Sequence, residues 1–243
     1  MEITYIGHSG FLIEWENCYF LFDYYQGEIP VMHADKKIFV FVSHKHEDHF
    51  NPHIFTLHQK YKNIQYILSS DIRLTRDKVL KFGMTEELFA KILSVKPSSE
   101  YVLLDQKQER LILKTLKSTD CGVAFLVNYC GKTVYHAGDL NLWVWKGETK
   151  QYNNNMTAMF GRVMESLRNI VIDIAFIPLD PRLKEWYYMG PECFLSTAKV
   201  RYVFPMHFWG QSSIIQQFKE ERKINTDTEV VEISREGQKW YCL

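Results

Sequence analysis

The sequence has no excess of charge of either sign, because its 29 Lys and Arg residues balance its 29 Asp and Glu residues. A neutral chain carries no basic field of the kind that draws proteins to phosphate backbones, which argues modestly against nucleic acid as a partner. No apolar run approaches the roughly 18 residues that a membrane helix needs. The N-terminal stretch has an acid at Glu2 and no positively charged segment, so it predicts no signal peptide. We therefore expect a soluble protein without membrane insertion.

Cysteine is also scarce. The five cysteines are scattered and never spaced as Cys-x-x-Cys, so the sequence predicts neither a disulfide framework nor a zinc ribbon. A reducing cytoplasm is the simplest location for such a chain. The five are Cys18, Cys121, Cys130, Cys193 and Cys242.

The chain has no linker rich in Pro, Gly or Ser, no repeat of fixed period and no segment of low complexity. Its 243 residues are 46% hydrophobic and 15% aromatic, which is enough for a sizeable packed core. We interpret residues 1–243 as a single domain, and a split into two domains as the weaker interpretation.

Short runs of β-branched and aromatic residues predict most of the secondary structure. We expect strands at residues 3–7, 10–15, 18–23, 37–43, 64–70, 109–118, 122–129, 132–138, 172–180, 202–208, 228–234 and 238–243. We expect helices at 50–63, 71–83, 154–169, 190–200 and 212–223. The N-terminal caps of three of them are expected at Asn51, Asp71 and Gly190-Pro191. This order of elements indicates two sheets with helices outside them.

Three histidines and an aspartate follow the apolar strand expected at 37–43, at His44, His46, Asp48 and His49. They precede a helix start, which places them on a strand-to-helix loop, where functional residues often lie. His44 and His46 can project from the same side of an extended backbone, because side chains alternate along a strand. Imidazoles and a carboxylate are ligands that zinc, iron and manganese accept. A solvated polar loop is the alternative, but this spacing favours a metal site.

The motif His-x-His-x-Asp-His resembles the signature of the metallo-β-lactamase fold superfamily of metallohydrolases. The resemblance spans nearly the whole chain and implies an α/β (α+β) fold, a four-layer αββα sandwich. It implies that Asp23 supports the histidine loop, that Asp139 in "VYHAGD" bridges two metal ions, and that His207 in "FPMHFWG" supplies one more ligand. Without the resemblance, Asp139 would be interpreted as a turn or helix-capping aspartate, and His207 as a hydrogen-bonded core or surface residue.

The opening stretch "ITYIGHSGFLIE" is similar to a branch of that superfamily that includes ascorbate-6-phosphate lactonase and N-acyl phosphatidylethanolamine phospholipase D. In that branch a Gly-His pair ends the first strand and faces the site. The similarity implies that His8 contacts substrate or a metal-bound water. A hydrogen bond from His8 to a neighbouring strand is the alternative.

The sequence departs from the family pattern near Ser118, where the family supplies a third histidine for the first metal. No histidine lies between His58 and His136. Serine is a poor zinc ligand, so we do not expect Ser118 to bind metal directly, whereas Asp120 could act as a replacement carboxylate. Three outcomes follow: a two-metal site with a weakened first position, a single metal at the second position, or a site that no longer catalyses. A plain turn between strands at "STD", residues 118–120, is a further interpretation.

Two further positions are candidates for substrate contacts. Trp143 follows Asp139 and could line a pocket for an apolar or ring-shaped substrate, although packing on the core is the preferred interpretation. Arg182 follows a strand exit and could bind a carboxylate or phosphate in a bidentate way. An ion pair with Asp180 is its alternative. We do not count His136 as a metal ligand.

These observations predict metal-assisted hydrolysis of a small-molecule ester, lactone or phosphodiester. A bound cation lowers the pKa of a water to about 7, and Asp48 is the candidate catalytic residue that orients that water. We expect one or two zinc ions, with manganese or iron as alternatives. A metal- or ligand-binding member that has lost catalysis is the second hypothesis, motivated by Ser118. The oligomeric state is left open, a homo-oligomer included.

Overall fold

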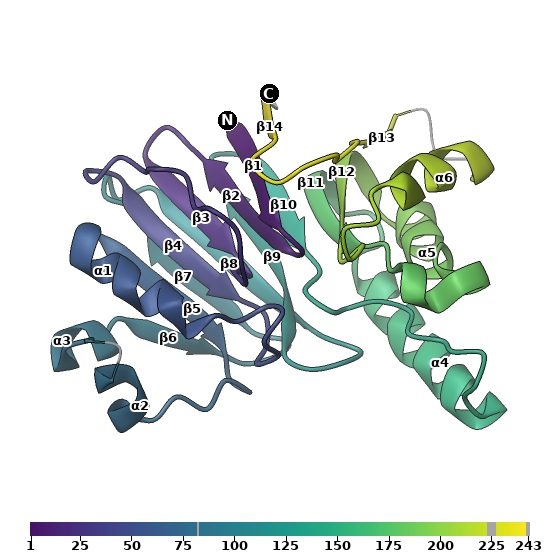
Figure 1. The fold of residues 1–243 in the computed structure, drawn as a ribbon, viewed down its shortest axis with the longest axis horizontal. Helices are drawn as coiled ribbons and strands as arrows, with labels where there is room; N and C mark the ends of the chain where they lie inside the picture. Colours follow the sequence, from purple (N-terminus) through teal and green to yellow (C-terminus); the bar gives the residue numbers. More distant parts are fainter. Residues whose placement is uncertain (82, 223–226, 242–243) are drawn as a thin grey trace.

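The computed structural model describes residues 1–81, 83–222 and 227–241. Two seven-stranded sheets face each other (Figure 1). The first has the order β14-β1-β2-β3-β4-β5-β6, and the second β13-β12-β11-β10-β9-β8-β7. The strands of the first sheet are β1 (Glu2–Gly7), β2 (Gly10–Glu14), β3 (Cys18–Phe22), β4 (Lys37–Val42), β5 (Ile64–Ser69), β6 (Ile92–Val95) and β14 (Lys239–Tyr241). Those of the second are β7 (Glu100–Leu104), β8 (Arg110–Lys117), β9 (Val123–Tyr129), β10 (Lys132–His136), β11 (Val171–Pro178), β12 (Lys199–Met206) and β13 (Glu229–Val230).

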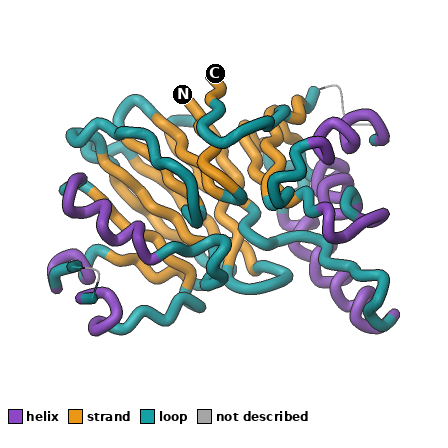
Figure 2. Tube along the Cα trace, in the orientation of Figure 1, coloured by secondary structure: helices purple, strands orange, loops and turns teal. Residues whose placement is uncertain are grey.

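Helices cover the outer face of each sheet, so the layers run helix, sheet, sheet, helix (Figure 2). On the first sheet lie η1 (Pro52–Thr56), α1 (Leu57–Lys60), α2 (Arg76–Leu80) and α3 (Glu86–Phe89). On the second lie α4 (Lys150–Ser166), η2 (Pro181–Trp186), α5 (Met189–Thr197) and α6 (Ser213–Glu221). The expected four-layer αββα sandwich is confirmed. Within the described residues, no helix has the length and apolar character needed to cross a membrane.

Strand β4 shows how the sequence produces these layers. Its five apolar residues are all fully buried, because successive side chains point to opposite faces and both faces are covered. Phe39 and Phe41 join the core between the sheets, whereas Ile38, Val40 and Val42 pack under the helices. Each such side chain contributes about 1.5–3 kcal/mol through burial of apolar surface. The loop that follows Val42 therefore begins from a rigid element.

Several expected elements differ in extent. The helix expected at 50–63 is a 3₁₀ turn followed by one α turn, although Asn51 does cap it by accepting the His53 N–H at 2.9 Å. The helix expected at 71–83 is reduced to α2, which Thr75 caps, because Asp71 instead accepts the Lys45 N–H. Helix α3 and strands β6 and β7 were not expected.

Three further boundaries also differ. The strand expected at 228–234 is only β13, and α5 begins at Met189, before Gly190 and Pro191. Gly190 is required by packing rather than capping, because a Cβ there would lie 1.8 Å from Asn141 Oδ1. Parts of two expected elements, at 223 and at 242–243 with Cys242, lie outside the described residues.

Candidate metal centre

The candidate residues lie on loops that leave one edge of the sandwich. In the first sheet, β3 and β4 are parallel and lead into Asp23 and the loop that starts at Ser43. In the second sheet, β10, β11 and β12 are parallel and lead into Asp139, Asp180 and His207. Because the carboxyl ends of parallel strands meet at the same edge, residues distant in sequence converge there.

Two groups of side chains converge closely enough to hold a metal ion. In each, the ligand atoms lie within 4.8 Å of one another. The first cluster consists of His44, His46, Asp120 and Asp139. The second cluster consists of His8, Asp48, His49 and His207.

Asp139 lies between the two clusters. Its Oδ2 is 3.4 Å from His44 Nε2, while its Oδ1 is 3.0 Å from His49 Nε2 and 3.3 Å from His207 Nε2. The Trp143 indole N–H donates to the Asp139 carbonyl oxygen at 2.8 Å, which fixes the backbone at this position. Asp139 therefore has the placement that a bridging carboxylate would need.

The first cluster contains Asp120 where a third histidine was expected. Asp120 Oδ2 lies 3.4 Å from His46 Nδ1, and His46 Nδ1 lies 3.0 Å from His44 Nε2. Ser118 lies in neither cluster; its hydroxyl oxygen accepts the Asp120 backbone N–H at 3.2 Å. The side chain of Thr119, between them, donates to the Asn141 carbonyl oxygen at 2.6 Å. The "STD" segment is thus an organised turn that presents the Asp120 carboxylate.

This turn packs directly against the start of the histidine loop. Gly122 has φ +66°, and a Cβ there would lie 2.0 Å from the Ser43 carbonyl oxygen. The Val123 N–H donates to the same oxygen at 2.9 Å. Glycine is required because no side chain fits between the two backbones. The close approach brings Asp120 beside His46.

Three imidazole nitrogens of the second cluster and one oxygen of the neighbouring Asp139 are buried without a hydrogen-bond partner among the described residues: His8 Nε2, His49 Nε2, His207 Nε2 and Asp139 Oδ1. Asp48 Oδ2 lies 3.3 Å from His8 Nε2 and 3.6 Å from His207 Nε2. Leaving buried polar groups unsatisfied costs about 1–3 kcal/mol each. Converging unsatisfied imidazole and carboxylate atoms fit a bound cation.

Asp23 fixes the orientation of two histidines. Its carboxylate accepts the Ser43 backbone N–H (2.7 Å) and the Ser43 hydroxyl (2.6 Å). Because that hydroxyl proton is used, the His44 Nδ1–H donates to Ser43 Oγ (2.9 Å), and its Nε2 keeps a lone pair. His49 Nδ1–H likewise donates to Asp23 Oδ2 at 2.8 Å. Both imidazoles therefore use Nδ1 for these bonds and direct Nε2 toward Asp139, the orientation that metal ligands need.

Asp180 does the same for His207 and was missed from the sequence, where it was considered only as an ion-pair partner. It accepts the His207 Nδ1–H at 2.8 Å and binds the Arg182 guanidinium through Nε (3.0 Å) and Nη2 (2.6 Å). Burial opposes its charge, but His207 and Arg182 outweigh burial and lower the pKa of Asp180 to about 2. One feature of the sequence could have indicated this role. Asp180 follows one predicted strand and His207 follows the next, so both lie at strand exits.

Asp180→Ala is therefore expected to weaken metal binding about 10- to 100-fold, since it removes the group that orients His207. Competition with a chromogenic chelator measures the affinity. Asp173→Ala is the matched control, because Asp173 lies at the other end of β11 and pairs with Lys132 at 3.0 Å. Equal affinities of the two variants would contradict this role for Asp180.

The charges of the site favour a cation. Burial alone would lower the pKa of His49, but the Asp139 and Asp23 carboxylates outweigh it and raise that pKa well above the ordinary value. Burial would also lower the pKa of His207, but the nearby carboxylates, Asp139 first among them, outweigh burial and raise that pKa. Burial would raise the pKa of Asp139, yet His49 and His207 hold it well below the usual range. Without a metal, the site thus attracts protons to the positions where a cation would bind.

The backbone is strained at the same place. Four residues around the clusters have positive φ although they are not glycine: His8 (52°), Asp23 (39°), His207 (62°) and Trp209 (52°). Such conformations cost on the order of 1–3 kcal/mol each and persist where the surrounding structure enforces them. Their concentration here is typical of a functional site.

A pocket of about 260 Å³ opens onto both clusters. Trp143 and Trp145 form one wall, with parallel rings 6.2 Å apart, and Trp143 is buried. Arg182 reaches the same pocket but is already paired with Asp180, and its guanidinium lies 4.7 Å above the Trp209 ring. The ion pair considered from the sequence is therefore present. His136 is buried but belongs to neither cluster. Its ring stacks on the Phe22 ring, with the two ring centroids 4.9 Å apart.

The comparisons with known proteins agree with this fold. The chain belongs to the β-lactamase superfamily domain family, whose model matches residues 2–154. A UPF0173 metal-dependent hydrolase from Opitutus terrae is 28% identical over 221 residues, which are 86% of this chain and 85% of that protein. A second UPF0173 metal-dependent hydrolase, from Desulforamulus reducens, is 26% identical and covers 86% of this chain and 84% of its own.

Solved structures show the same architecture. Igni18, a metallo hydrolase from Ignicoccus hospitalis, has a TM-score of 0.63 at 15% identity, covering 98% of this chain and 97% of its own. The metallo-β-lactamase fold protein YhfI from Bacillus subtilis has a TM-score of 0.58 at 12% identity, covering 98% of each chain. At these identities the likeness establishes the fold alone. His207 lies beyond the matched range of the family model.

Proposed function

We propose that this protein is a metal-dependent hydrolase that acts on a small ester, lactone or phosphodiester. The observation that supports this most strongly is the set of four buried atoms without hydrogen-bond partners, described above, three of which lie in the second cluster and one on Asp139 beside it. The metal-dependent hydrolases among its relatives support the same class of activity.

The ligand assignment follows the two clusters. In the first site, His44, His46 and Asp120 would bind one cation, with Asp139 shared. In the second site, the shared Asp139 would join His8, Asp48, His49 and His207. The mixture of imidazoles and carboxylates suits zinc, manganese or iron. Both sites draw ligands from both sheets, which supports our interpretation of residues 1–243 as one domain.

A divalent cation in these sites would supply Lewis acidity and would lower the pKa of a water from about 16 to near 7. The Asp48 side chain is 24% exposed and lines the pocket, so it can reach a water and accept its proton. Burial would raise the pKa of Asp48, but His207 and His8 outweigh burial and keep that pKa below its usual range, so the side chain is a carboxylate at neutral pH. Trp143 and Trp145 narrow the pocket and exclude water beside the substrate.

The pocket volume of about 260 Å³ supports a small-molecule substrate, since it lies at the lower limit of ligand pockets. A cytoplasmic location is supported by the described cysteines Cys18, Cys121, Cys130 and Cys193, which form no disulfide with one another.

The second hypothesis is a metal- or ligand-binding member of the fold without catalysis. The observation that suggests it is the serine at position 118, where a histidine was expected. Asp120 argues against it, because its carboxylate completes four ligand residues in the first cluster. The two hypotheses differ in metal content and in turnover.

Protein purified without chelator is expected to hold about two metal ions per chain and to hydrolyse a panel of nitrophenyl esters, lactones and phosphodiesters. Asp120→Ala should lower the metal content to about one ion, because the first cluster loses a ligand. Glu148→Ala is the control, since Glu148 is exposed and belongs to neither cluster. Elemental analysis by mass spectrometry measures the metal. Wild-type protein with less than about one ion and no turnover would favour the second hypothesis.

A further inference from the structure

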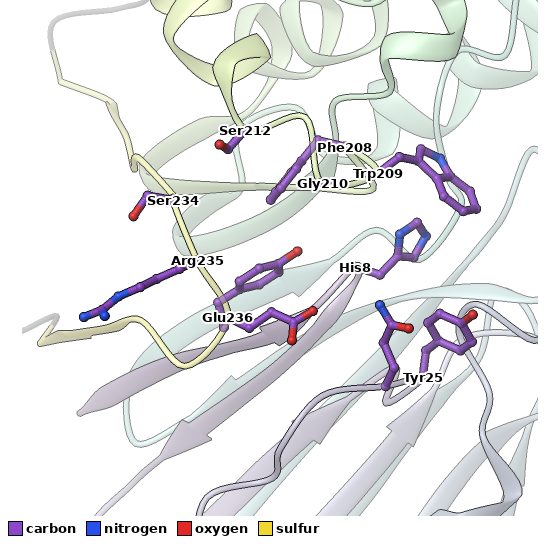
Figure 3. A pocket seen from close by; sticks show the side chains of 11 residues that line it. His8, Tyr25, Phe208, Trp209, Gly210, Ser212, Ser234, Arg235 and Glu236 are labelled. Carbon is purple, nitrogen blue, oxygen red and sulfur yellow. The ribbon is translucent and has the colours of Figure 1, made fainter.

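A second pocket, of about 400 Å³, is lined by one residue of the second cluster, His8 (Figure 3). His8 lines it and is only 7% exposed, and its Nε2 has no hydrogen-bond partner among the described residues. The same Nε2 lies 3.3 Å from Asp48 Oδ2. His8 therefore belongs both to the second cluster and to the wall of this pocket.

One carboxylate, that of Glu236, lines this pocket. It makes no hydrogen bond or ion pair with another residue in the described part of the chain. Figure 3 shows it directed toward the His8 side of the pocket, whereas the guanidinium of Arg235 points the opposite way. The negative charge of Glu236 is thus available to a ligand and is not neutralised by its basic neighbour.

The backbone holds Glu236 in this position. The Gly237 N–H donates to the Tyr5 carbonyl oxygen at 2.8 Å, and the Tyr5 N–H donates to the Gln238 carbonyl oxygen at 3.0 Å. These bonds fix the turn against β1. Gly7 leaves room for the carboxylate, because a Cβ there would lie 2.9 Å from Glu236 Oε1. Glu236 is therefore placed by a paired turn and not by a free loop.

Aromatic side chains form much of the remaining lining, which also includes Gln26, Gly210 and Arg235. Tyr5, Tyr25, Phe208 and Trp209 line the pocket together with two serines, Ser212 and Ser234. The His8 ring lies 4.5 Å from the Trp209 ring and 6.3 Å from the Tyr25 ring. The negative faces of aromatic rings attract cations, and organic ammonium groups are recognised by aromatic walls combined with a carboxylate.

We propose that this pocket is a subsite for an organic ammonium group, with Glu236 as its counter-charge and Tyr25 and Phe208 as its walls. The inference rests on the proposed function, since it assigns to the substrate of that hydrolase a cationic group on the far side of His8 from the reacting bond. The metal centre would repel a cation close to it, and the Glu236 carboxylate would offset that repulsion within the pocket.

Binding of choline and of its neutral isostere 3,3-dimethylbutan-1-ol to the protein as purified tests the subsite without requiring catalysis. Choline is expected to bind about tenfold more tightly than the isostere, because only the cation interacts with Glu236 and the ring faces. Ligand-observed NMR titration measures both affinities. Equal affinities for the two probes, or no binding of choline, would overturn the proposal whether or not the protein hydrolyses esters.

Glu236→Gln keeps the shape of the side chain and is expected to abolish the preference for choline. Glu232→Gln is the matched control, because Glu232 is an exposed acid of the same segment that pairs with Lys219. Preference retained in Glu236→Gln would contradict the role of this carboxylate. Hydrolysis without choline binding would refute the subsite alone, whereas choline binding without hydrolysis on any substrate would refute only the proposed function.

Discussion

Asp139→Asn is expected to remove most metal from both clusters and to lower kcat/KM by about 10³ or more. The carboxylate has one oxygen toward each cluster, 3.4 Å from His44 Nε2 and 3.0 Å from His49 Nε2. An amide of the same shape offers one weak oxygen ligand and no charge, so it cannot serve both. Elemental analysis and steady-state kinetics on the same preparation measure the two losses.

A buried aspartate outside the site provides the control for this substitution. Asp105 is 2% exposed and accepts the Tyr129 hydroxyl at 2.7 Å, and it belongs to neither cluster. Asp105→Asn should lower the unfolding temperature while leaving the metal content unchanged. If Asp139→Asn retained about two ions per chain, its bridging role would be wrong.

The histidine loop could be predicted from the sequence because its residues are adjacent there. An apolar strand, three histidines and an aspartate within a few positions specify both the ligand types and their support. Asp139 and His207 needed the family resemblance, since a single aspartate or histidine after a strand has several ordinary roles. The structure places both of them beside the loop.

Asp120 and Asp180 show what the sequence leaves undetermined. The sequence offered Asp120 as one of several outcomes at "STD", and only the turn made by Ser118 and Thr119 decides where its carboxylate points. Asp180 was considered as a partner of Arg182, which it is, but its contact with His207 depends on the pairing of β11 with β12. Contacts between strand ends far apart in sequence are set by sheet order, which local patterns do not encode.

The region after β5 was predicted poorly for a different reason. Residues 71–83 have helical composition, but a helix there would need Asp71 as its cap, and Asp71 instead accepts the Lys45 N–H beside His46. A tertiary contact to the histidine loop thus overrides the local propensity, and the helix starts later, at Arg76, with Thr75 as its N-cap.

Asp48→Ala is expected to lower kcat by about 10³, because the variant lacks the carboxylate that orients the attacking water and accepts its proton. The fold should persist, since the Asp48 side chain is partly exposed and lies on a loop held by Asp23 and Ser43. Kinetics, metal content and thermal unfolding should be measured together. Unchanged unfolding with at least one ion retained would locate the defect in the proton transfer.

The matched control is Glu47→Ala, because Glu47 is the exposed acid next to Asp48 in the same loop and belongs to neither cluster. Its turnover should equal that of the wild type. Wild-type turnover in Asp48→Ala would contradict the catalytic role, and complete loss of metal would show instead that Asp48 acts chiefly as a ligand. These outcomes separate the two functions that its position permits, since its Oδ2 lies 3.3 Å from His8 Nε2 and the side chain also faces the pocket.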